Sequence, residues 1–238
     1  MRKKNPYFQF KRFSVDHAGS AMKVGTDGVL IGCWADVAGS KTLLDIGTGS
    51  GVIALILAQR TADDAIIHGV EIEPEAAEQA RLNVAASPWP DKIEVFPVRI
   101  QEFRPDLKFD HIVTNPPFFV NSFLPPDKRR KEARHAASLS FTDLIAAVVN
   151  LLDPAGKFSL IIPPVEGAVL REYALQKGLY CSRLWEFRPR PEKKIERWLM
   201  EFSFQEQETA KGEVVMYADG NEWSESFKAL SRDFYIKL

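Results

Sequence analysis

The four residues Asn115-Pro116-Pro117-Phe118 combine a side-chain amide, a rigid turn and an aromatic ring directly after the apolar run 109–113. The asparagine amide offers one acceptor and two donors, and the two prolines fix φ and remove backbone donors. A carbonyl freed in such a turn can face a ligand on which Phe118 stacks. These residues outline a pocket for a flat amino-substituted or amide-like group, although the same residue types also form plain proline turns.

A second motif, Asp45-Ile46-Gly47-Thr48-Gly49-Ser50-Gly51, follows the apolar run 42–46 and precedes a segment, 52–60, with the apolar spacing of a helix. A glycine motif between a strand and a helix indicates a loop whose backbone can approach a ligand closely. Glu71 ends the next predicted strand and can accept both hydrogens of a ribose diol. Together these residues predict a nucleotide-like cofactor at the ends of two adjacent strands.

The spacing and charge of the glycine motif distinguish two classes of cofactor. A dinucleotide site has the pattern G-x-G-x-x-G, whereas this chain has Gly47, Gly49 and Gly51 at every second position, preceded by Asp45. An acidic side chain beside the loop suits a sulfonium and an ammonium group and would repel a pyrophosphate. The motif therefore favours S-adenosylmethionine.

The elements that must position these residues alternate between strands and helices. Strands are predicted at 42–46, 65–70, 93–98, 109–113, 157–162, 180–187 and 198–204, with helices at 52–60, 74–82, 141–152 and 167–176. This alternation predicts an α/β fold with a mostly parallel sheet and helices on both faces. The last two strands, with no helix between them, predict an antiparallel hairpin at one edge. Residues 213–217 can add a short strand, and the apolar spacing of 227–238 indicates that the end of the chain packs against the core.

Length and composition fit one ordinary globular domain. The chain has 238 residues, of which 45% are hydrophobic and 26% charged, which suffices for a single α/β domain over 1–238. The N-terminus has no apolar segment after its basic residues, so we expect a cytoplasmic protein. Cys33 and Cys181 are far apart in the sequence, which predicts neither a disulfide framework nor a metal site.

The formal net charge of −1 conceals an uneven distribution of basic residues. Three short stretches, 2–12, 128–135 and 188–197, each hold five of the 31 lysines and arginines. Each stretch alone is compatible with a solvated loop. If they meet on one face, they form a phosphate-binding surface. We accordingly treat about 1–25 as a basic N-terminal extension and about 119–137 as a basic substrate loop; Tyr7, Phe8, Phe10 and Phe13 in the extension either contact RNA or pack in the core.

The combined motifs resemble those of the class I, Rossmann-like methyltransferases that modify amino groups through an (Asn/Asp)-Pro-Pro-(aromatic) motif. The stretch 21–32, Ala133-Arg134-His135 and 227–235 are similar to the bacterial tRNA1(Val) adenosine-37 N6-methyltransferases, and this resemblance covers nearly the whole chain. It implies a seven-stranded, mostly parallel sheet with an antiparallel edge hairpin. It also implies a tRNA substrate that is modified in its anticodon loop. Independently of the resemblance, we expect a monomer that needs no metal.

The resemblance implies roles for individual residues. The catalytic residues are Asn115, Pro116, Pro117 and Phe118. The cofactor-binding residues are Thr26, Asp27, Asp45, Gly47, Thr48, Gly49, Gly51, Glu71, Ile72, Gln101 and Asn115, in which Gln101 stands where many such enzymes have an aspartate for the adenine amino group. The residues assigned to the RNA are Phe119, Arg129, Arg130, Lys131, Arg134 and His135. His135 is also the nearest histidine that could remove a proton.

The expected reaction is methylation of an exocyclic amine. Its lone pair is delocalised into the ring, so the site must hold the nitrogen by acceptors, here the Asn115 oxygen and the Pro116 carbonyl, that aim the lone pair at the methyl group. The same chemistry also serves guanine N2 in ribosomal RNA, adenine in DNA or a glutamine side chain, although glutamine enzymes usually have Tyr in place of Phe118. A reading from another class is a non-catalytic RNA-binding protein, which predicts a damaged cofactor loop, and 45–51 shows none.

Overall fold

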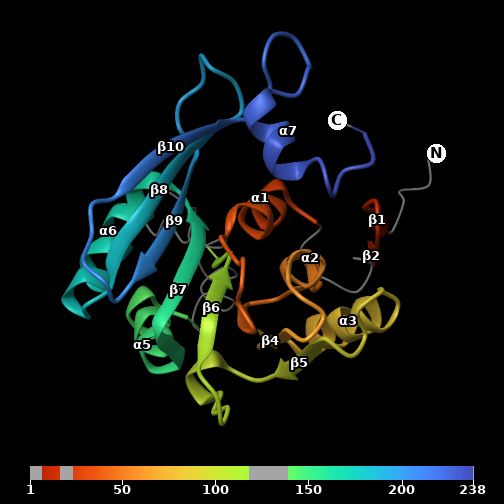
Figure 1. The fold of residues 1–238 in the computed structure, drawn as a ribbon, viewed down its shortest axis with the longest axis vertical. Helices are drawn as coiled ribbons and strands as arrows, with labels where there is room; N and C mark the ends of the chain where they lie inside the picture. Colours follow the sequence, from red (N-terminus) through yellow and green to blue (C-terminus); the bar gives the residue numbers. More distant parts are fainter. Residues whose placement is uncertain (1–6, 17–23, 118–138, 238) are drawn as a thin grey trace, which may run out of the picture.

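An eight-stranded sheet with helices on both faces forms the centre of the molecule, and a separate two-stranded hairpin lies near the N-terminus (Figure 1). These features come from a computed structural model, which describes residues 7–16, 24–117 and 139–237. The strand order is β10-β8-β9-β7-β6-β3-β4-β5. Only β9 is antiparallel to its neighbours among the paired strands of this sheet.

The sheet confirms the predicted α/β class and adds one strand to it. The strands are β3 (Thr42–Ile46), β4 (Ile66–Glu71), β5 (Ile93–Pro97), β6 (Phe109–Thr114), β7 (Leu152–Ile162), β8 (Tyr180–Arg188), β9 (Arg197–Ser203) and β10 (Ala210–Val215). The sheet has eight strands rather than seven, because β10, which overlaps the possible strand predicted at 213–217, pairs with β8 outside the hairpin. β10 begins with polar residues, so its first half resembles a loop in the sequence.

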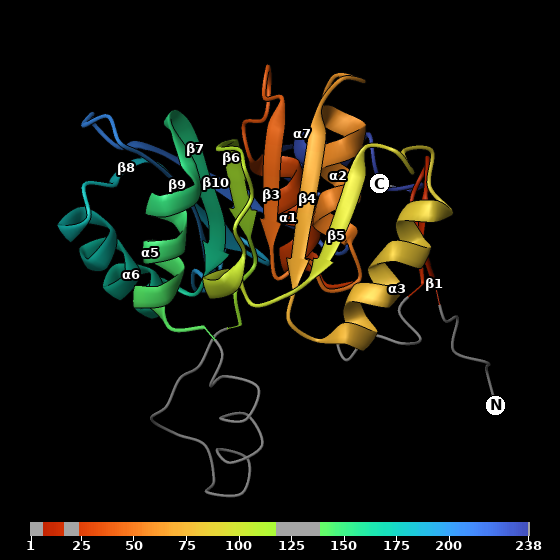
Figure 2. The same ribbon diagram turned by 90° about the horizontal axis from the view of Figure 1, so that it is seen from below.

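Helices cover the two faces of the sheet as two separate layers. Figures 1 and 2 show α1 (Thr26–Trp34), α2 (Val52–Arg60), α3 (Pro74–Ala85) and α7 (Glu225–Ser231) on one side and α5 (Phe141–Leu151) and α6 (Pro164–Gln176) on the other. A short 3-10 turn, η1 (Ile100–Glu102), follows β5. Ser140 caps the N-terminus of α5, since its Oγ accepts the Asp143 amide at 3.1 Å. Each layer encloses its own apolar cluster.

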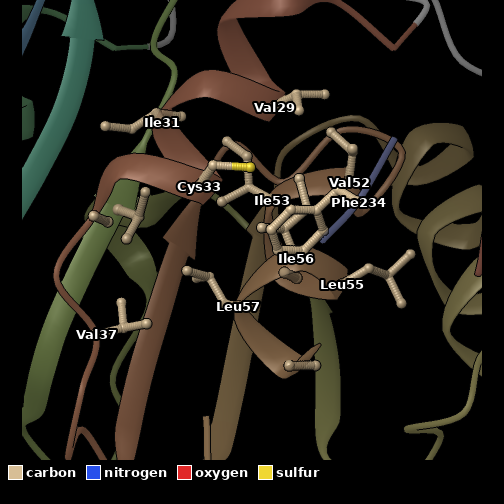
Figure 3. Packing of buried hydrophobic residues seen from close by; sticks show 14 of the residues in the cluster. Val29, Ile31, Cys33, Val37, Val52, Ile53, Leu55, Ile56, Leu57 and Phe234 are labelled. Carbon is tan, nitrogen blue, oxygen red and sulfur yellow. The ribbon is translucent and has the colours of Figure 1, made fainter. Parts of the chain in front are cut away.

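Helix α1 was not assigned from the sequence, and its surroundings explain why. Its residues from Gly28 to Trp34 are all buried, and a helix that is apolar on every side lacks the periodic pattern of a surface helix. A Cβ on Gly32 would stand 3.0 Å from Ile56, so glycine allows α1 and α2 to pack closely (Figure 3). The Arg60 side chain at the end of α2 donates to the Gly32 and Ala35 carbonyls at 2.6 and 2.7 Å and thereby satisfies the end of α1.

The N-terminal hairpin, β1 (Tyr7–Gln9) and β2 (Ser14–Asp16), packs on the α2 side of the sheet. Phe10 and Phe13 are 0% and 4% exposed, so these two aromatics belong to the core rather than to an RNA surface. Two basic residues of this region also make internal contacts: Arg12 lies over the Trp89 ring at 5.1 Å, and Lys11 Nζ donates to the Arg232 carbonyl at 2.5 Å. At the other end of the chain, Phe227 and Phe234 are buried, which confirms that the C-terminal segment packs against the core.

Candidate active site

The carboxyl ends of four parallel strands bring the predicted cofactor and catalytic residues to one edge of the sheet. Ile46 at the end of β3 is level with Val70 of β4 and with Thr114 of β6, and Glu71 is level with Pro97 of β5. The glycine loop and Asn115 therefore leave neighbouring strands at the same height. A crevice at this edge is where open α/β sheets bind ligands.

The glycine loop turns tightly because three of its residues have positive φ. Gly47, Gly49 and Gly51 have φ of 74°, 56° and 83°, conformations that side chains with a Cβ rarely adopt. The Gly47 and Thr48 amides donate to the Val70 carbonyl at 2.8 and 3.1 Å, which fixes the loop against the end of β4. A Cβ placed on Gly47 would meet no other atom within 4 Å, so the space beside this residue is open. The loop leads directly into α2.

Asp45 is fully buried beneath this loop and is held by two donors. Its Oδ2 accepts from the Thr48 hydroxyl at 2.6 Å and from the Ala54 amide at 3.2 Å, so the Thr48 side chain serves Asp45. The other oxygen, Oδ1, has no hydrogen-bond partner among the described residues. Burial raises the pKa of the Asp45 carboxyl to about 7, against the lowering effect of the two hydrogen bonds. A cation placed beside it would favour the carboxylate.

Glu71 is 8% exposed, and backbone donors orient its carboxylate. Oε2 accepts the Gly49 amide at 2.9 Å and Oε1 accepts the Glu73 amide at 3.0 Å. Because a carboxylate oxygen can accept more than one hydrogen bond, both oxygens keep acceptor capacity for a ligand diol. Ile72, which follows, is half-buried beside it.

Asn115 has a buried side-chain oxygen, Oδ1, for which the described residues supply no donor. The preceding residue fixes its position: the Thr114 hydroxyl, fully buried, donates to the Ile46 carbonyl at 2.7 Å and joins the ends of β6 and β3. Pro116 is buried and Pro117 exposed. Asn115 thus leaves the sheet at a fixed point, with an acceptor that no described residue pairs.

The start of α1 lies beside the glycine loop, as the assignment of Thr26 and Asp27 requires. Gly28 in its first turn approaches Val52, the first residue of α2, so closely that a Cβ would stand 3.3 Å from its Cγ1. The Asp27 carboxylate accepts from Arg197 Nε at 2.8 Å. The sequence indicates Arg197 only as a member of the basic stretch 188–197, because no local pattern links it to a residue 170 positions away.

The remaining predicted site residues lie in η1 or outside the described residues. Gln101 lies in η1, which follows β5 at the same edge. Phe118, Phe119, Arg129, Arg130, Lys131, Arg134 and His135 lie outside the described residues. Of the other histidines, His111 is fully buried in the middle of β6, away from this edge, and its Nε2 lies 2.9 Å from Ser159 Oγ. Burial lowers the pKa of His111 to about 3.

The arrangement suits an organic cation and an amino group. Asp45 Oδ1 and Asn115 Oδ1, two buried acceptors to which no residue in the described ranges donates, occupy neighbouring strand ends. Across the described ranges, His, Cys, Asp and Glu nowhere gather in threes that could hold a metal ion. In the same ranges every helix is too short or too polar to cross a membrane.

Comparisons with solved structures give the fold. A predicted O-methyltransferase from Agrobacterium tumefaciens superimposes with a TM-score of 0.65 at 20% identity, over 87% of this chain and 96% of that one. The ribosomal protein L11 methylase of Lactobacillus delbrueckii subsp. bulgaricus gives a TM-score of 0.56 at 18% identity, over 79% and 83% of the two chains. The fold is therefore that of the class I methyltransferases.

Sequence comparisons are more specific. Residues 22–165 match the methyltransferase small domain family. The tRNA1(Val) (adenine(37)-N6)-methyltransferase of Bacteroides thetaiotaomicron is 43% identical over 234 residues, which cover 98% of this chain and 99% of that protein. The protein of the same name from Pseudoalteromonas translucida is 42% identical over 231 residues, with 97% and 99% covered. This chain accordingly belongs to the family of the tRNA1(Val) (adenine(37)-N6)-methyltransferases.

Proposed function

We propose that this chain transfers a methyl group from S-adenosylmethionine to the N6 amine of adenosine 37 in tRNA1(Val). The observation that carries the proposal is a pair of buried oxygens at adjoining strand ends, Asp45 Oδ1 and Asn115 Oδ1, for which the described part of the chain supplies no donor. The first suits a cationic cofactor and the second suits the N–H of an amine. The names of the full-length relatives supply the base and the tRNA.

The residues around the glycine loop fit the parts of this cofactor. When bound, S-adenosylmethionine supplies an electrophilic methyl group on a sulfonium. Gly47, Gly49 and Gly51 leave room for its close approach to the backbone, and the oriented Glu71 carboxylate accepts from ribose hydroxyls. Asp45 contributes negative charge to the methionine side of the site, where Thr26 and Asp27 also stand. Ile72 and Gln101 are assigned to the adenine.

Asn115 and Pro116 act on the substrate amine. The Asn115 side-chain oxygen and the Pro116 carbonyl each accept one N–H of the amine, so that the nitrogen lone pair points at the methyl group. As positive charge grows on nitrogen, both acceptors bind more strongly, which stabilises the transition state over the ground state. The aromatic ring of Phe118 is assigned to stacking on the base. No strong base is needed, because a nitrogen that has gained the methyl group readily loses its proton.

An adenine can enter such a site only after it leaves its stack. A nucleotide in an anticodon loop costs less to extrude than one in a duplex, which agrees with position 37 as the target. Phe119, Arg129, Arg130, Lys131, Arg134 and His135 are assigned to holding that loop. We further propose that the chain works as a single-domain monomer in the cytoplasm, where tRNA is modified.

The test is to incubate the protein with methyl-labelled S-adenosylmethionine and a tRNA1(Val) transcript, then digest the RNA and identify the modified nucleoside by mass spectrometry. We expect N6-methyladenosine, and no label in a transcript that carries guanosine at position 37. The same assay on total tRNA, ribosomal RNA and protein extract tests the competing substrates. Demonstrated cofactor binding without N6-methyladenosine in any tRNA would overturn the proposal, and N2-methylguanosine or methylglutamine would replace it.

A further inference from the structure

The loop between β8 and β9, residues 189–196, lies at the same edge of the sheet as Asn115. β8 runs parallel to β10 and antiparallel to β9, so the loop leaves the carboxyl end. Thr114 is level with Leu160, and Leu160 with Met200. Arg197, where the loop ends, is therefore two strands, or about 10 Å, from Asn115 across the sheet and about 7 Å further along it.

One end of this loop is fixed to the cofactor side of the site. Arg197 Nε donates to Asp27 Oδ2 at 2.8 Å, and the two side chains are only 28% and 21% exposed. Asp27 belongs to the first turn of α1, which packs against Val52 directly after the glycine loop. The β8–β9 loop thus ends beside the proposed cofactor site, and the rest of the loop extends outward.

The outer side of the loop is fixed to a second turn. Arg190 lies over the Tyr217 ring at 5.3 Å, and its guanidinium donates to the Gly220 carbonyl and, at 3.1 Å, to Asn221 Oδ1. Figure 1 shows this loop and the connection from β10 to α7 projecting together at one end of the molecule. Pro189 and Pro191 restrict the backbone on both sides of Arg190. The loop is consequently a braced projection.

The charges of the loop divide into two groups. The arginines are engaged within the protein: Arg188 pairs with Glu186 and Glu213, Arg190 with the second turn, and Arg197 with Asp27. Lys193 and Lys194 at the tip are exposed and form no ion pair with any described residue. Glu192, also exposed, is the acidic residue beside them.

We propose that Lys193 and Lys194 bind phosphates of the tRNA backbone next to the target adenosine, as a contact surface additional to the catalytic pocket. The inference rests on the proposed function. Two ammonium groups on a braced loop, a few nucleotides' length from Asn115, match the polyanion that must lie across this edge. Because lysine acts on phosphate as a point charge and reads no base, these contacts place the tRNA and leave the choice of base to the pocket.

The test compares Lys193→Gln/Lys194→Gln with wild type in a titration of tRNA1(Val) at several salt concentrations. We expect the double variant to bind at least fivefold more weakly near 0.1 M salt, and the slope of log K against log[salt] to become shallower by about 1.4–1.8, as the loss of two phosphate contacts requires. The KM for tRNA should rise, while the maximal rate and the affinity for S-adenosylmethionine stay the same.

Two further variants fix the sign and the place of the effect. Glu192→Gln removes a charge that repels phosphate, so it should strengthen tRNA binding about twofold to threefold. Lys108→Gln/Lys177→Gln neutralises two exposed lysines, one directly before β6 and one directly after α6, at the amino ends of the parallel strands, and should leave the salt slope unchanged.

A double variant at Lys193 and Lys194 with the affinity and salt slope of wild type overturns this inference and leaves the proposed function intact. An equal effect of the Lys108 and Lys177 control also overturns it, since the contacts would then be unspecific. Failure of the wild-type protein to form N6-methyladenosine contradicts the proposed function instead, so the two failures are distinguishable.

Discussion

At the scale of single residues, the site holds two groups whose arrangement folding alone does not explain. Asp45 Oδ1 and Asn115 Oδ1 are buried without hydrogen-bond donors from the described residues. An unsatisfied buried group of this kind costs about 1–3 kcal/mol. A ligand that brings an N–H or a cation to each oxygen recovers that free energy on binding, which is why these positions indicate function.

Asn115→Ala should separate catalysis from cofactor binding. We expect the single-turnover rate of methyl transfer to fall by about 10²–10³-fold, the usual loss for a deleted transition-state hydrogen bond. The affinity for S-adenosylmethionine, measured by calorimetry, should change little because Asp45 and Glu71 remain. A parallel loss of cofactor affinity and rate would mean that Asn115 holds the cofactor instead of the amine.

Asp45 should make cofactor binding depend on pH. Burial raises its pKa to about 7 in the free protein, and a bound cation favours the carboxylate, so binding at lower pH must first remove a proton. We expect the affinity for S-adenosylmethionine to weaken by up to about tenfold for each pH unit below 7. Calorimetry at pH 6 in two buffers of different ionisation enthalpy should detect release of about one proton. Asp45→Asn should bind more weakly and lose this dependence; a proton release that persists in the variant would point to another group.

At the scale of elements, the join between β3 and β6 sets the catalytic geometry. The Thr114 hydroxyl donates to the Ile46 carbonyl at 2.7 Å. Thr114→Val keeps the volume and removes this bond, so we expect a loss of about 1–2 kcal/mol in stability. We also expect a lower maximal rate with KM nearly unchanged, because Asn115 loses its fixed starting point.

Thr114→Ser provides the matched control, since it keeps the hydroxyl and loses the methyl group. It should recover most of the rate even though the small cavity lowers its stability. Rates that follow the melting temperatures of the two variants, irrespective of the hydroxyl, would reduce Thr114 to a packing role.

Much of the element order could be predicted because the signals are local. The helix 52–60 and the strand 42–46 match α2 and β3 at both ends, since glycines and apolar spacing mark them in the sequence. Asp45, Glu71 and Asn115 could be placed together because each stands at a strand end and parallel pairing brings those ends to one edge. The end of α1 depends on Arg60, and Asp27 depends on Arg197. Partners so distant in sequence leave no local pattern.

At the scale of the whole molecule, a buried polar row links the parallel part of the sheet to its antiparallel edge. His111 of β6 contacts Ser159 of β7 at 2.9 Å, and Glu201 of β9 accepts from Arg183 of β8 at 3.1 Å. The Ser159 hydroxyl and a Glu201 oxygen lie 3.5 Å apart, which completes the row. Polar groups paired this way favour one strand register over its alternatives.

Two buried groups in this fold give stability opposite dependences on pH. Burial raises the pKa of Asp45 to about 7, so its contribution to stability is present below the unfolded pKa of about 3.9 and is lost as pH rises to about 7. Burial lowers the pKa of His111 to about 3, so its contribution is present above the unfolded pKa of about 6.5 and is lost as pH falls. Between about pH 4 and 6.5 the two slopes, each up to about 1.4 kcal/mol per pH unit, have opposite signs and largely cancel.

Removal of one group should therefore reveal the other. In urea unfolding without cofactor, we expect Asp45→Asn to lose about 1–2 kcal/mol more than wild type between about pH 6.5 and 5, because the histidine is unopposed. His111→Gln should instead gain stability over this interval, because Asp45 is unopposed. His68, whose pKa burial also lowers, destabilises the fold in acid in the same direction as His111, so His68→Gln on each background separates its share. Parallel pH profiles for wild type and both variants would show that neither buried group controls stability in this range, and would assign the pH dependence to carboxylates at the surface.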